Sequence, residues 1–316
     1  MRIGQNPAKF TNTVARPERI TVAVLNFIPF LSGYYTEMLD VLKVCLNSIR
    51  ETADLPFDLL VFDNGSCEEA LQYLADEKQA GRIQHLMLSE KNLGKGGGWN
   101  VMLAGAPGEI IAYADNDVLF HPGWLSRSIQ ILETFPNVGM VTSRPFRTDT
   151  ELYSNTLAWA EHDPGVRVER GAFIPWESFL EFDLSLGKPE AEIRSRYEST
   201  QDVRLHYRGV TALAGASHWQ FVAYKNVLAQ FLPFDMDRPM GQVKQLDRRM
   251  NEAGKLRLMT SEPHVMNISN SMRGISSPVH KPADSKGRRI ILDLPPIKSV
   301  LLKIYGQIFR WYADRS

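Results

Sequence analysis

Cysteine is scarce in this 316-residue chain, which contains only Cys45 and Cys67. Neither belongs to a CxxC motif or to a cluster with histidine, so the sequence offers no disulfide framework and no zinc-binding pattern. We therefore expect each thiol to fill space in the core of a reduced, cytoplasmic protein. The polar first 18 residues lack the apolar segment of a signal peptide, which favours the same compartment.

The chain also has no excess of positive or negative charge, and it has no long apolar segment. Lys+Arg and Asp+Glu each total 36 residues, so no basic excess points to a nucleic-acid partner. No stretch of about 20 apolar residues is present, and a membrane-spanning helix is not expected. With 44% hydrophobic residues, the chain is long enough for one large domain, or for one domain with an appendage.

Apolar and amphipathic segments alternate through the first half of the chain. Strands are predicted at 20–26, 58–62, 83–88 and 109–114, with helices at 38–50 and 68–77. This order predicts an α/β fold with a mostly parallel central sheet flanked by helices. Ligands of such sheets bind beyond the carboxyl ends of the strands, where the Asn26, Asp63 and Asp115 motifs are expected to meet.

Two carboxylates one residue apart follow the strand at 109–114, in Asp115-Asn116-Asp117. If the segment stays extended, Asp115 and Asp117 share a face and Asn116 points away. Two carboxylates held so close repel each other unless a cation lies beside them, and Mg²⁺ or Mn²⁺ suits such ligands. The alternative is a polar turn.

A glycine-rich segment, 92–100, contains three consecutive glycines from Gly96 to Gly98. Consecutive glycines lose more backbone entropy on folding than other residues, so a chain keeps them where the backbone approaches a ligand closely or adopts positive φ. The order of residues fits neither a Walker loop nor a GxGxxG motif. We predict a loop that contacts a ligand and leads into a short helix, against the alternative of a simple connection.

Together these motifs resemble those of the family 2 glycosyltransferases of the GT-A fold, particularly the rhamnosyl- and galactofuranosyltransferase-like branch. The resemblance rests on Leu25-Asn26-Phe27, Asp63-Asn64-Gly65-Ser66, the 92–100 segment and Asp115-Asn116-Asp117. It implies a hexosyltransferase that uses a nucleoside-diphosphate sugar and acts on a carbohydrate or lipid-linked acceptor, in cell-surface polysaccharide or glycolipid synthesis.

The resemblance also implies roles for individual residues. Asp63 would contact the nucleobase, Asp115 would lie near the ribose, and Asp117, with Asp115 more loosely, would hold Mn²⁺ or Mg²⁺. Lys95 would add positive charge nearby, or be an ordinary solvated lysine. The complete set expected to bind the donor is Asn26, Phe27, Asp63, Asn64, Asn92, Gly94, Lys95, Gly98, Asn100, Asp115 and Asn116.

The middle of the chain fits the resemblance less closely. Segment 144–209 is rich in aromatic and charged residues, as expected of an acceptor-binding region or of an ordinary covering layer, and 175–200 is predicted to be helical with a break at 187–189. The small-residue segment that follows resembles the part of the family that faces the donor sugar. Gly215, His218 and Trp219 are its candidate sugar contacts, although a lone histidine is more often structural.

The acidic pair that supplies the family's catalytic base is replaced here by Gln242 and Val243. Asp235 or Asp237 would then act as the base of an inverting enzyme, although Asp237 also suits the N-cap of a helix predicted at 240–253. Two alternatives are a retaining enzyme that needs no such base and an inactive homologue.

Beyond this point the expectations are fewer. His264 is a candidate metal ligand, with a surface or capping role as its alternative. Segment 297–316 mixes apolar, aromatic and basic residues, as in a helix that lies on a membrane. The alternative is a helix that packs on the domain or on the partner in a homodimer.

The expected organisation is an N-terminal extension at 1–18 and a nucleotide-sugar-binding half at 19–143. An acceptor-binding half at 144–275 and a tail at 276–316 complete it. Rival functions are a sugar-phosphate nucleotidyltransferase and a non-catalytic protein that binds sugar nucleotides or glycans. The first normally has a basic, glycine-rich loop after its first strand, whereas 27–36 contains no lysine or arginine.

Overall fold

The computed structural model of the chain describes residues 3–238, 240–241 and 243–272. The chain divides into two compact units, 1–272 and 273–316. The second unit, including the helix predicted at 297–316, lies outside the described residues. The two expected halves, 19–143 and 144–275, meet in one sheet, because strands from the second half return to pair beside strands of the first.

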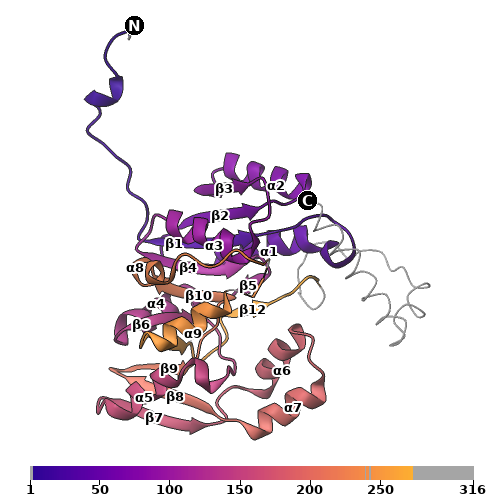
Figure 1. Ribbon diagram of the computed structural model, residues 1–316, viewed down its shortest axis with the longest axis vertical. Helices are drawn as coiled ribbons and strands as arrows, with labels where there is room; N and C mark the ends of the chain where they lie inside the picture. Colours follow the sequence, from indigo (N-terminus) through magenta and orange to yellow (C-terminus); the bar gives the residue numbers. More distant parts are fainter. Residues whose placement is uncertain (1–2, 239, 242, 273–316) are drawn as a thin grey trace, which may run out of the picture. The chain divides into compact units, whose positions relative to one another are not determined.

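A ten-stranded sheet forms the centre of the first unit, in the order β3-β2-β1-β4-β10-β6-β11-β9-β8-β7 (Figure 1). Its strands are β1 Ile20–Asn26, β2 Asp58–Asn64, β3 His85–Ser89, β4 Ile110–Asp115, β6 Val138–Thr142, β7 Val166–Gly171, β8 Asp202–Tyr207, β9 Val210–Ala214, β10 Gln220–Tyr224 and β11 Leu256–Met259. A separate pair joins β5 Val118–Phe120 to β12 Val265–Asn267.

Parallel pairing is concentrated in the part of the sheet built by the first half of the chain. It joins β3, β2, β1 and β4, and again joins β6 to β11. The other neighbours in the large sheet are antiparallel. The predicted α/β class is confirmed, and the parallel strands β1, β2 and β4 have the buried, β-branched sequences expected of such a sheet.

Helices lie on both faces of the sheet. They are α1 Met38–Thr52, α2 Glu68–Gln79, α3 Gly94–Gly105, α4 Trp124–Thr134, α5 Ser154–His162, α6 Trp176–Ser185, α7 Glu190–Ser199, α8 Lys225–Leu228 and α9 Lys244–Glu252. Short 3₁₀ turns are η1 Pro7–Phe10, η2 Gly33–Tyr35, η3 Thr150–Leu152 and η4 Ala229–Phe231. The predicted break at 187–189 is confirmed, since it separates α6 from α7.

The core next to the site is the layer where α3 and α9 cover one face of the sheet. Trp99 and Met102 from α3 and Leu246 from α9 are buried there against alternate residues of β1, β2, β4, β6 and β10. On the opposite face, α4 approaches the sheet where Ser128 and Ser143 exchange a hydrogen bond of 2.8 Å. The carboxyl ends of β1, β2, β4 and β6 therefore lie between two helical layers.

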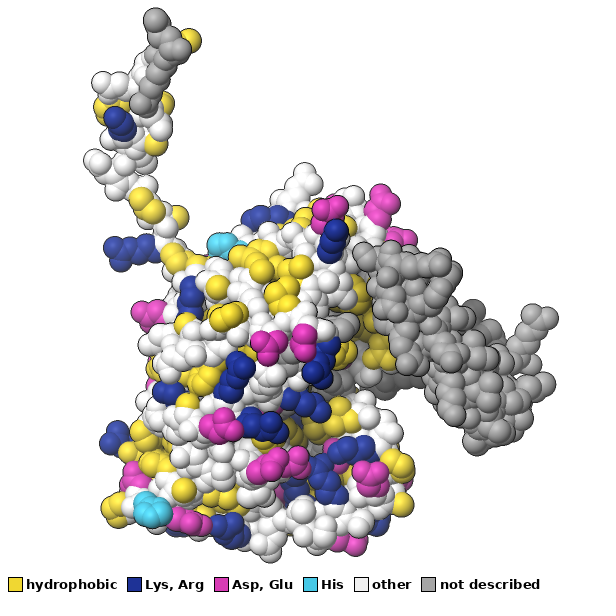
Figure 2. Space-filling view, in the orientation of Figure 1, with side chains coloured by type: hydrophobic (Ala, Val, Ile, Leu, Met, Phe, Trp, Pro, Cys, Tyr) yellow, Lys and Arg dark blue, Asp and Glu magenta, His cyan; other side chains and the backbone are white. Residues whose placement is uncertain are grey.

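Surface charge is mixed on the face shown in Figure 2, where basic and acidic side chains are interspersed. Within the described residues, no helix is long and apolar enough to cross a lipid bilayer.

Candidate active site

Three polar motifs meet at one edge of the sheet, as the sequence predicted. Asn26 at the end of β1 is in register with Asp63 of β2, while Leu25 is in register with Asp115 of β4. Adjacent strands lie about 5 Å apart. The side chains that follow these strands are therefore immediate neighbours.

A buried chain of hydrogen bonds ties these strand ends together. The Nδ2 of Asn116 donates to Oδ1 of Asn26 at 2.7 Å, and the Nδ2 of Asn26 donates to Oδ2 of Asp63 at 2.7 Å. The backbone N–H groups of Gly65 and Ser66 donate to Oδ1 of Asp63 at 3.2 and 2.9 Å. Asn26 and Asp63 are completely buried, so their role in this structure is to position the turns that follow β2 and β4.

Asp115 forms an ion pair with the helix on the other side of the edge. The Nζ of Lys95 lies 2.7 Å from its carboxylate, and the hydroxyl of Tyr113 also donates to it. Burial, followed by the negative charge of Asp115, raises the pKa of Tyr113 well above its usual range. Tyr113 therefore acts as a neutral donor, and Lys95 is a charged component of the site.

Asp117 lies beyond the end of β4, in the turn before β5. We predicted that Asp115 and Asp117 share a face because the side chains of a strand alternate. Asp117 lies in the turn, so this alternation does not determine where its side chain points. One oxygen, Oδ1, is buried without a hydrogen-bond partner. Burial and then the charge of Asp115 raise the pKa of Asp117 to about 7, while Lys95 opposes the shift.

A divalent cation fits this unpaired oxygen. Within the described residues, no group of three His, Cys, Asp or Glu side chains comes together around a possible ion. Mg²⁺ and similar ions in nucleotide sites commonly use only one or two carboxylates, and phosphate oxygens and water supply the remaining ligands. Asp117, with Asp115 beside it, matches that ligand set.

The glycine-rich segment forms part of a helix, which corrects the predicted loop. Gly96, Gly97 and Gly98 lie in the first turns of α3. A Cβ on Gly98 would lie 2.9 Å from Cδ1 of Leu25, and one on Gly97 would lie 2.7 Å from the methyl group of Met236. Close packing against β1 and the 236 segment therefore accounts for these glycines, and a ligand contact is not needed to explain Gly98.

Three asparagines fix the position of α3. Asn64 donates to Oδ1 of Asn92 at 3.0 Å and to the carbonyl of Gly94 at 3.1 Å, which secures the start of the helix. Asn100 donates to the carbonyl of Phe234 at 2.9 Å and accepts from its N–H at 2.7 Å. The amides of Asn64, Asn92 and Asn100 thus hold backbone in place, and the donor contacts that the resemblance implied for them stay a prediction.

His218 belongs to a second charged cluster at the same edge of the sheet. Its Nδ1 lies 2.5 Å from Oδ2 of Asp247 on α9, and the other oxygen of Asp247 accepts from Arg257 on β11. The Arg257 guanidinium is buried, and burial lowers its pKa while the charge of Asp247 opposes the shift. Sequence reasoning did not pair His218 with Asp247.

The two neighbours of His218 in the predicted sugar-binding segment are buried. Gly215 has φ +124°, and a Cβ there would lie 3.0 Å from the methyl group of Met259. Trp219 stacks on Phe182, with ring centroids 5.6 Å apart. Its indole N–H is buried without a partner.

The residues predicted to act as the base lie on exposed backbone. Asp235 and Asp237 are both exposed, and Asp237 lies 3.4 Å from Arg238. The helix predicted at 240–253 begins later, as α9 at Lys244. Asp237 is therefore too far from the start of α9 to be its N-cap.

His264 lies at the far end of the β5–β12 pair from Asp117. Its Nδ1 is 2.9 Å from the carbonyl of Pro122, and its own carbonyl accepts from the N–H of His121. Asp117, by contrast, bonds through its carbonyl to the N–H of Ile268. His264 is therefore separated from the carboxylates by the length of β5, and its ring contacts the backbone just before α4.

Phe27 belongs to an aromatic group at the loop after β1. Its ring meets that of Tyr35 edge to face, with centroids 6.4 Å apart. Ser66 Oγ accepts from the N–H of Ile28 at 2.9 Å. The loop after β1 is thereby held beside the Asp63 turn.

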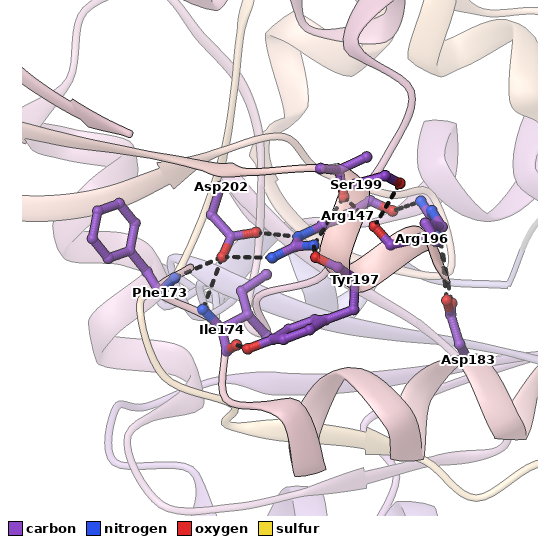
Figure 3. Close-up of polar contacts among 9 residues, drawn as sticks. Arg147, Phe173, Ile174, Asp183, Arg196, Tyr197, Ser199 and Asp202 are labelled. Carbon is purple, nitrogen blue, oxygen red and sulfur yellow. Dashed lines mark hydrogen bonds and ion pairs between the residues drawn. The ribbon is translucent and has the colours of Figure 1, made fainter. Parts of the chain in front are cut away.

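A buried arginine organises the segment predicted to bind the acceptor. The guanidinium of Arg147 lies 2.6 Å from Oδ1 of Asp202 and donates to the carbonyl of Tyr197 at 2.6 Å. Asp202 also accepts from the N–H groups of Phe173 and Ile174 at 2.8 and 2.9 Å (Figure 3). This network ties the segment after β6 to α7 and β8.

The segment that contains Asp115 and Asp117 is similar to a known protein family. Residues 33–179 match the family model described as glycosyl transferase family 2. This part of the chain is therefore similar to the family 2 glycosyltransferases. The matched residues include Lys95, Asp115 and Asp117, whereas Asn26, His218 and Asp247 lie outside them.

The curated relative that matches this chain is distant in sequence. A glycosyltransferase of Nostoc sp., itself uncharacterised, is 24% identical over 100 residues, which cover 32% of this chain and 31% of that one. The match thus spans about a third of the relative's length.

Two solved structures are similar to this chain. One is the mannosyltransferase PcManGT from Pyrobaculum calidifontis in complex with GDP-Man and Mn²⁺, with 17% identity, a TM-score of 0.47, and coverage of 82% of this chain and 59% of that chain. The other is S. aureus TarS, residues 1–349, with 12% identity, a TM-score of 0.43, and coverage of 79% and 60%.

Proposed function

We propose that the chain is a metal-dependent glycosyltransferase of the GT-A type. It would transfer a hexose from a nucleoside-diphosphate sugar to a carbohydrate or lipid-linked acceptor, in the synthesis of cell-surface polysaccharide or glycolipid. The observation that carries the proposal is the buried, unpaired Oδ1 of Asp117 beside the Lys95–Asp115 ion pair. All three residues lie within 33–179, the part of the chain that matches the family 2 glycosyltransferases.

The chemistry of the proposed reaction follows from charge. As the bond to the donor sugar stretches, negative charge develops on the departing diphosphate and positive charge on the anomeric carbon. Mn²⁺ or Mg²⁺ held by Asp117 and Asp115 would neutralise the diphosphate as a Lewis acid. Lys95 adds a fixed positive charge at the same place, and such preorganised charge is effective in a partly buried site.

The polar chain from Asn116 through Asn26 to Asp63 supports donor binding in a different way. Its members keep the turns after β2 and β4 in place before the nucleotide arrives, so little ordering is required on binding. We propose that the nucleobase and ribose lie against these turns, with Asp63 as the residue that positions them.

Calorimetry tests this function directly. UDP, GDP, dTDP and CDP would be titrated into the purified chain, each with Mn²⁺ and with a chelator. We expect one nucleotide to bind tightly, and only with the metal. Asp117→Asn should abolish the metal-dependent part, whereas the exposed Asp40→Asn serves as a matched control for loss of one negative charge.

Two outcomes would contradict the proposal. No binding of any of the four nucleotides under either condition would contradict the glycosyltransferase function and favour a degenerate binding protein. Metal-dependent binding that persists in Asp117→Asn would contradict the assignment of the metal ligand alone.

A further inference from the structure

The His218–Asp247 pair has the geometry of a histidine oriented by a carboxylate. The two side chains are 2.5 Å apart, and Asp247 is buried, with 5% of its side chain exposed, whereas 20% of the His218 side chain is exposed. Arg257 takes the second oxygen of Asp247 and also donates to the carbonyls of Leu152 and Ala216. The buried carboxylate thus has the opposite charge and the hydrogen bonds that it needs.

This contact fixes the tautomer of the imidazole. An ionised carboxylate can only accept hydrogen bonds, so Nδ1 of His218 carries the proton and Nε2 presents a lone pair. Among the described residues, no hydrogen bond engages Nε2. A partly exposed ring with a free Nε2 and a carboxylate on Nδ1 is the arrangement in which histidine accepts a proton.

The backbone places His218 beside the proposed donor site. The carbonyl of the next residue, Trp219, accepts from the N–H of Asp115 at 3.0 Å, and Gln220 is in register with Ala114 on β4. On the other side, Ser217 and Thr142 exchange hydrogen bonds at the end of β6. His218 therefore projects from the same sheet edge that carries Asp115.

We propose that His218 is the general base of the transfer reaction and that Asp247 is its positioning residue. This inference rests on the glycosyltransferase function proposed above. The proposal gives a role to Nε2 of His218, whereas the hydrogen bond to Asp247 engages only Nδ1. It also accounts for Gln242 and Val243, neither of which can accept the proton.

The proposed step is a single displacement. Nε2 of His218 takes the proton of the acceptor hydroxyl, and the electron pair of that oxygen forms the bond to the anomeric carbon. The bond from this carbon to the diphosphate breaks, and the nucleoside diphosphate leaves with the electron pair. The imidazolium returns its proton to solvent, and the anomeric configuration is inverted.

Turnover and nucleotide binding together test the proposal. Release of nucleoside diphosphate would be measured with Mn²⁺, UDP-, GDP-, dTDP- and CDP-linked hexoses, and α- and β-linked p-nitrophenyl hexosides as acceptors. His218→Gln can still donate to Asp247, so it should fold and bind nucleotide normally while kcat falls by about 10²–10⁴-fold with little change in donor KM. Free imidazole should restore part of the activity of His218→Ala. His162→Gln on α5, where the ring bonds the carbonyl of Ala158, is the matched control.

A second measurement reports on the pair without substrate. Long-range ¹⁵N NMR of histidine-labelled protein should show His218 protonated at Nδ1, and Asp247→Asn should change that pattern. An unprotonated Nδ1 in the wild type would overturn the proposal, as would a kcat of His218→Gln within about threefold of the wild type. Those results leave the enzyme function standing if the wild type still binds nucleotide with Mn²⁺, whereas failure of all nucleotide binding would overturn function and base together.

Discussion

At the scale of single residues, Asp117 shows how the fold prepares a site for a cation. Its buried Oδ1 has no hydrogen-bond partner, and its pKa is raised to about 7. Burial and the negative charge of Asp115 favour the protonated form of Asp117 more strongly than the positive charge of Lys95 opposes it. The proton and the metal therefore compete for the same group.

The stability of the metal-free chain should depend on this ionisation. A carboxyl pKa that is higher in the folded than in the unfolded state gives a contribution that is complete below the unfolded pKa, near 3.8, and is lost as the pH rises through about 7. Asp117→Asn removes the charge. In chelator, the free energy of unfolding of the variant relative to the wild type should rise by about 1–3 kcal/mol between pH 5 and pH 8.

Denaturant unfolding at several pH values measures this difference, with Asp40→Asn as the exposed control that should show no trend. The ionisation of Asp117 also predicts that the affinity of the wild type for Mn²⁺ and nucleotide falls about tenfold from pH 8 to pH 6, because the carboxyl group must lose its proton before it can bind the metal. A pH-independent difference between wild type and Asp117→Asn would contradict the raised pKa.

At the scale of the element, α3 is the helix whose sequence is least typical of helices. Its glycines let the helix approach β1 closely, as the 2.9 Å from a Cβ on Gly98 to Leu25 indicates. Glycine normally weakens a helix interior by about 1 kcal/mol relative to alanine. Packing of α3 on the sheet offsets that cost.

Gly98→Ala should therefore destabilise the chain despite the better helix propensity of alanine. We expect a loss of about 1–3 kcal/mol in the free energy of unfolding, because the core must move to admit the methyl group. Leu25→Val removes the δ-carbons that alanine would meet. The double variant should be more stable than the sum of the two single losses, which a double-mutant cycle by denaturant unfolding would measure. Strict additivity would show that the clash with Leu25 is not the cause.

The same helix shows what the sequence could and could not predict. Strands that end at or within one residue of Asn26, Asp63 and Asp115 were predictable, because buried parallel strands are continuous apolar runs bounded by turn residues. The Gly96–Gly98 run was predicted to be a loop because local propensity disfavours a helix there. The contact with Leu25 that makes glycine necessary lies about 70 residues away in the chain.

Side-chain partners were less predictable than strand ends. Asp63 and Asn100 match the motifs of a donor site, yet their polar atoms bond to Asn26 and to the Phe234 backbone. The pairing of His218 with Asp247 spans 29 residues and joins a loop to a helix face. This pairing could be predicted only from the strand register of the sheet together with the position of α9, neither of which the sequence pattern gives.

At the scale of the whole molecule, a buried ion pair holds the segment after β6 to α7 and β8. Arg147 and Asp202 are both nearly inaccessible, and Asp202 accepts four hydrogen bonds from Arg147, Phe173 and Ile174. Breaking a buried pair is far more costly than breaking a surface pair, because an uncompensated charge remains.

Asp202→Ala should lower the free energy of unfolding by about 3–5 kcal/mol, since it leaves the Arg147 guanidinium buried without its carboxylate. Glu161→Ala, which breaks the exposed Arg170–Glu161 pair, should cost about 1 kcal/mol or less. Denaturant unfolding measures both. Under conditions where Asp202→Ala is folded, its metal-dependent nucleotide affinity should equal that of the wild type, and a large loss of affinity would show that the network also shapes the donor site.

The Lys95–Asp115 ion pair has a consequence for the order in which ligands arrive. Because the ammonium group of Lys95 already neutralises the carboxylate of Asp115, a lone divalent ion would meet only one unbalanced negative charge, that of Asp117. A diphosphate brings the missing anionic oxygens with it. The cation should therefore bind as a complex with the nucleotide. In the absence of a donor, the protein should bind divalent metal only weakly.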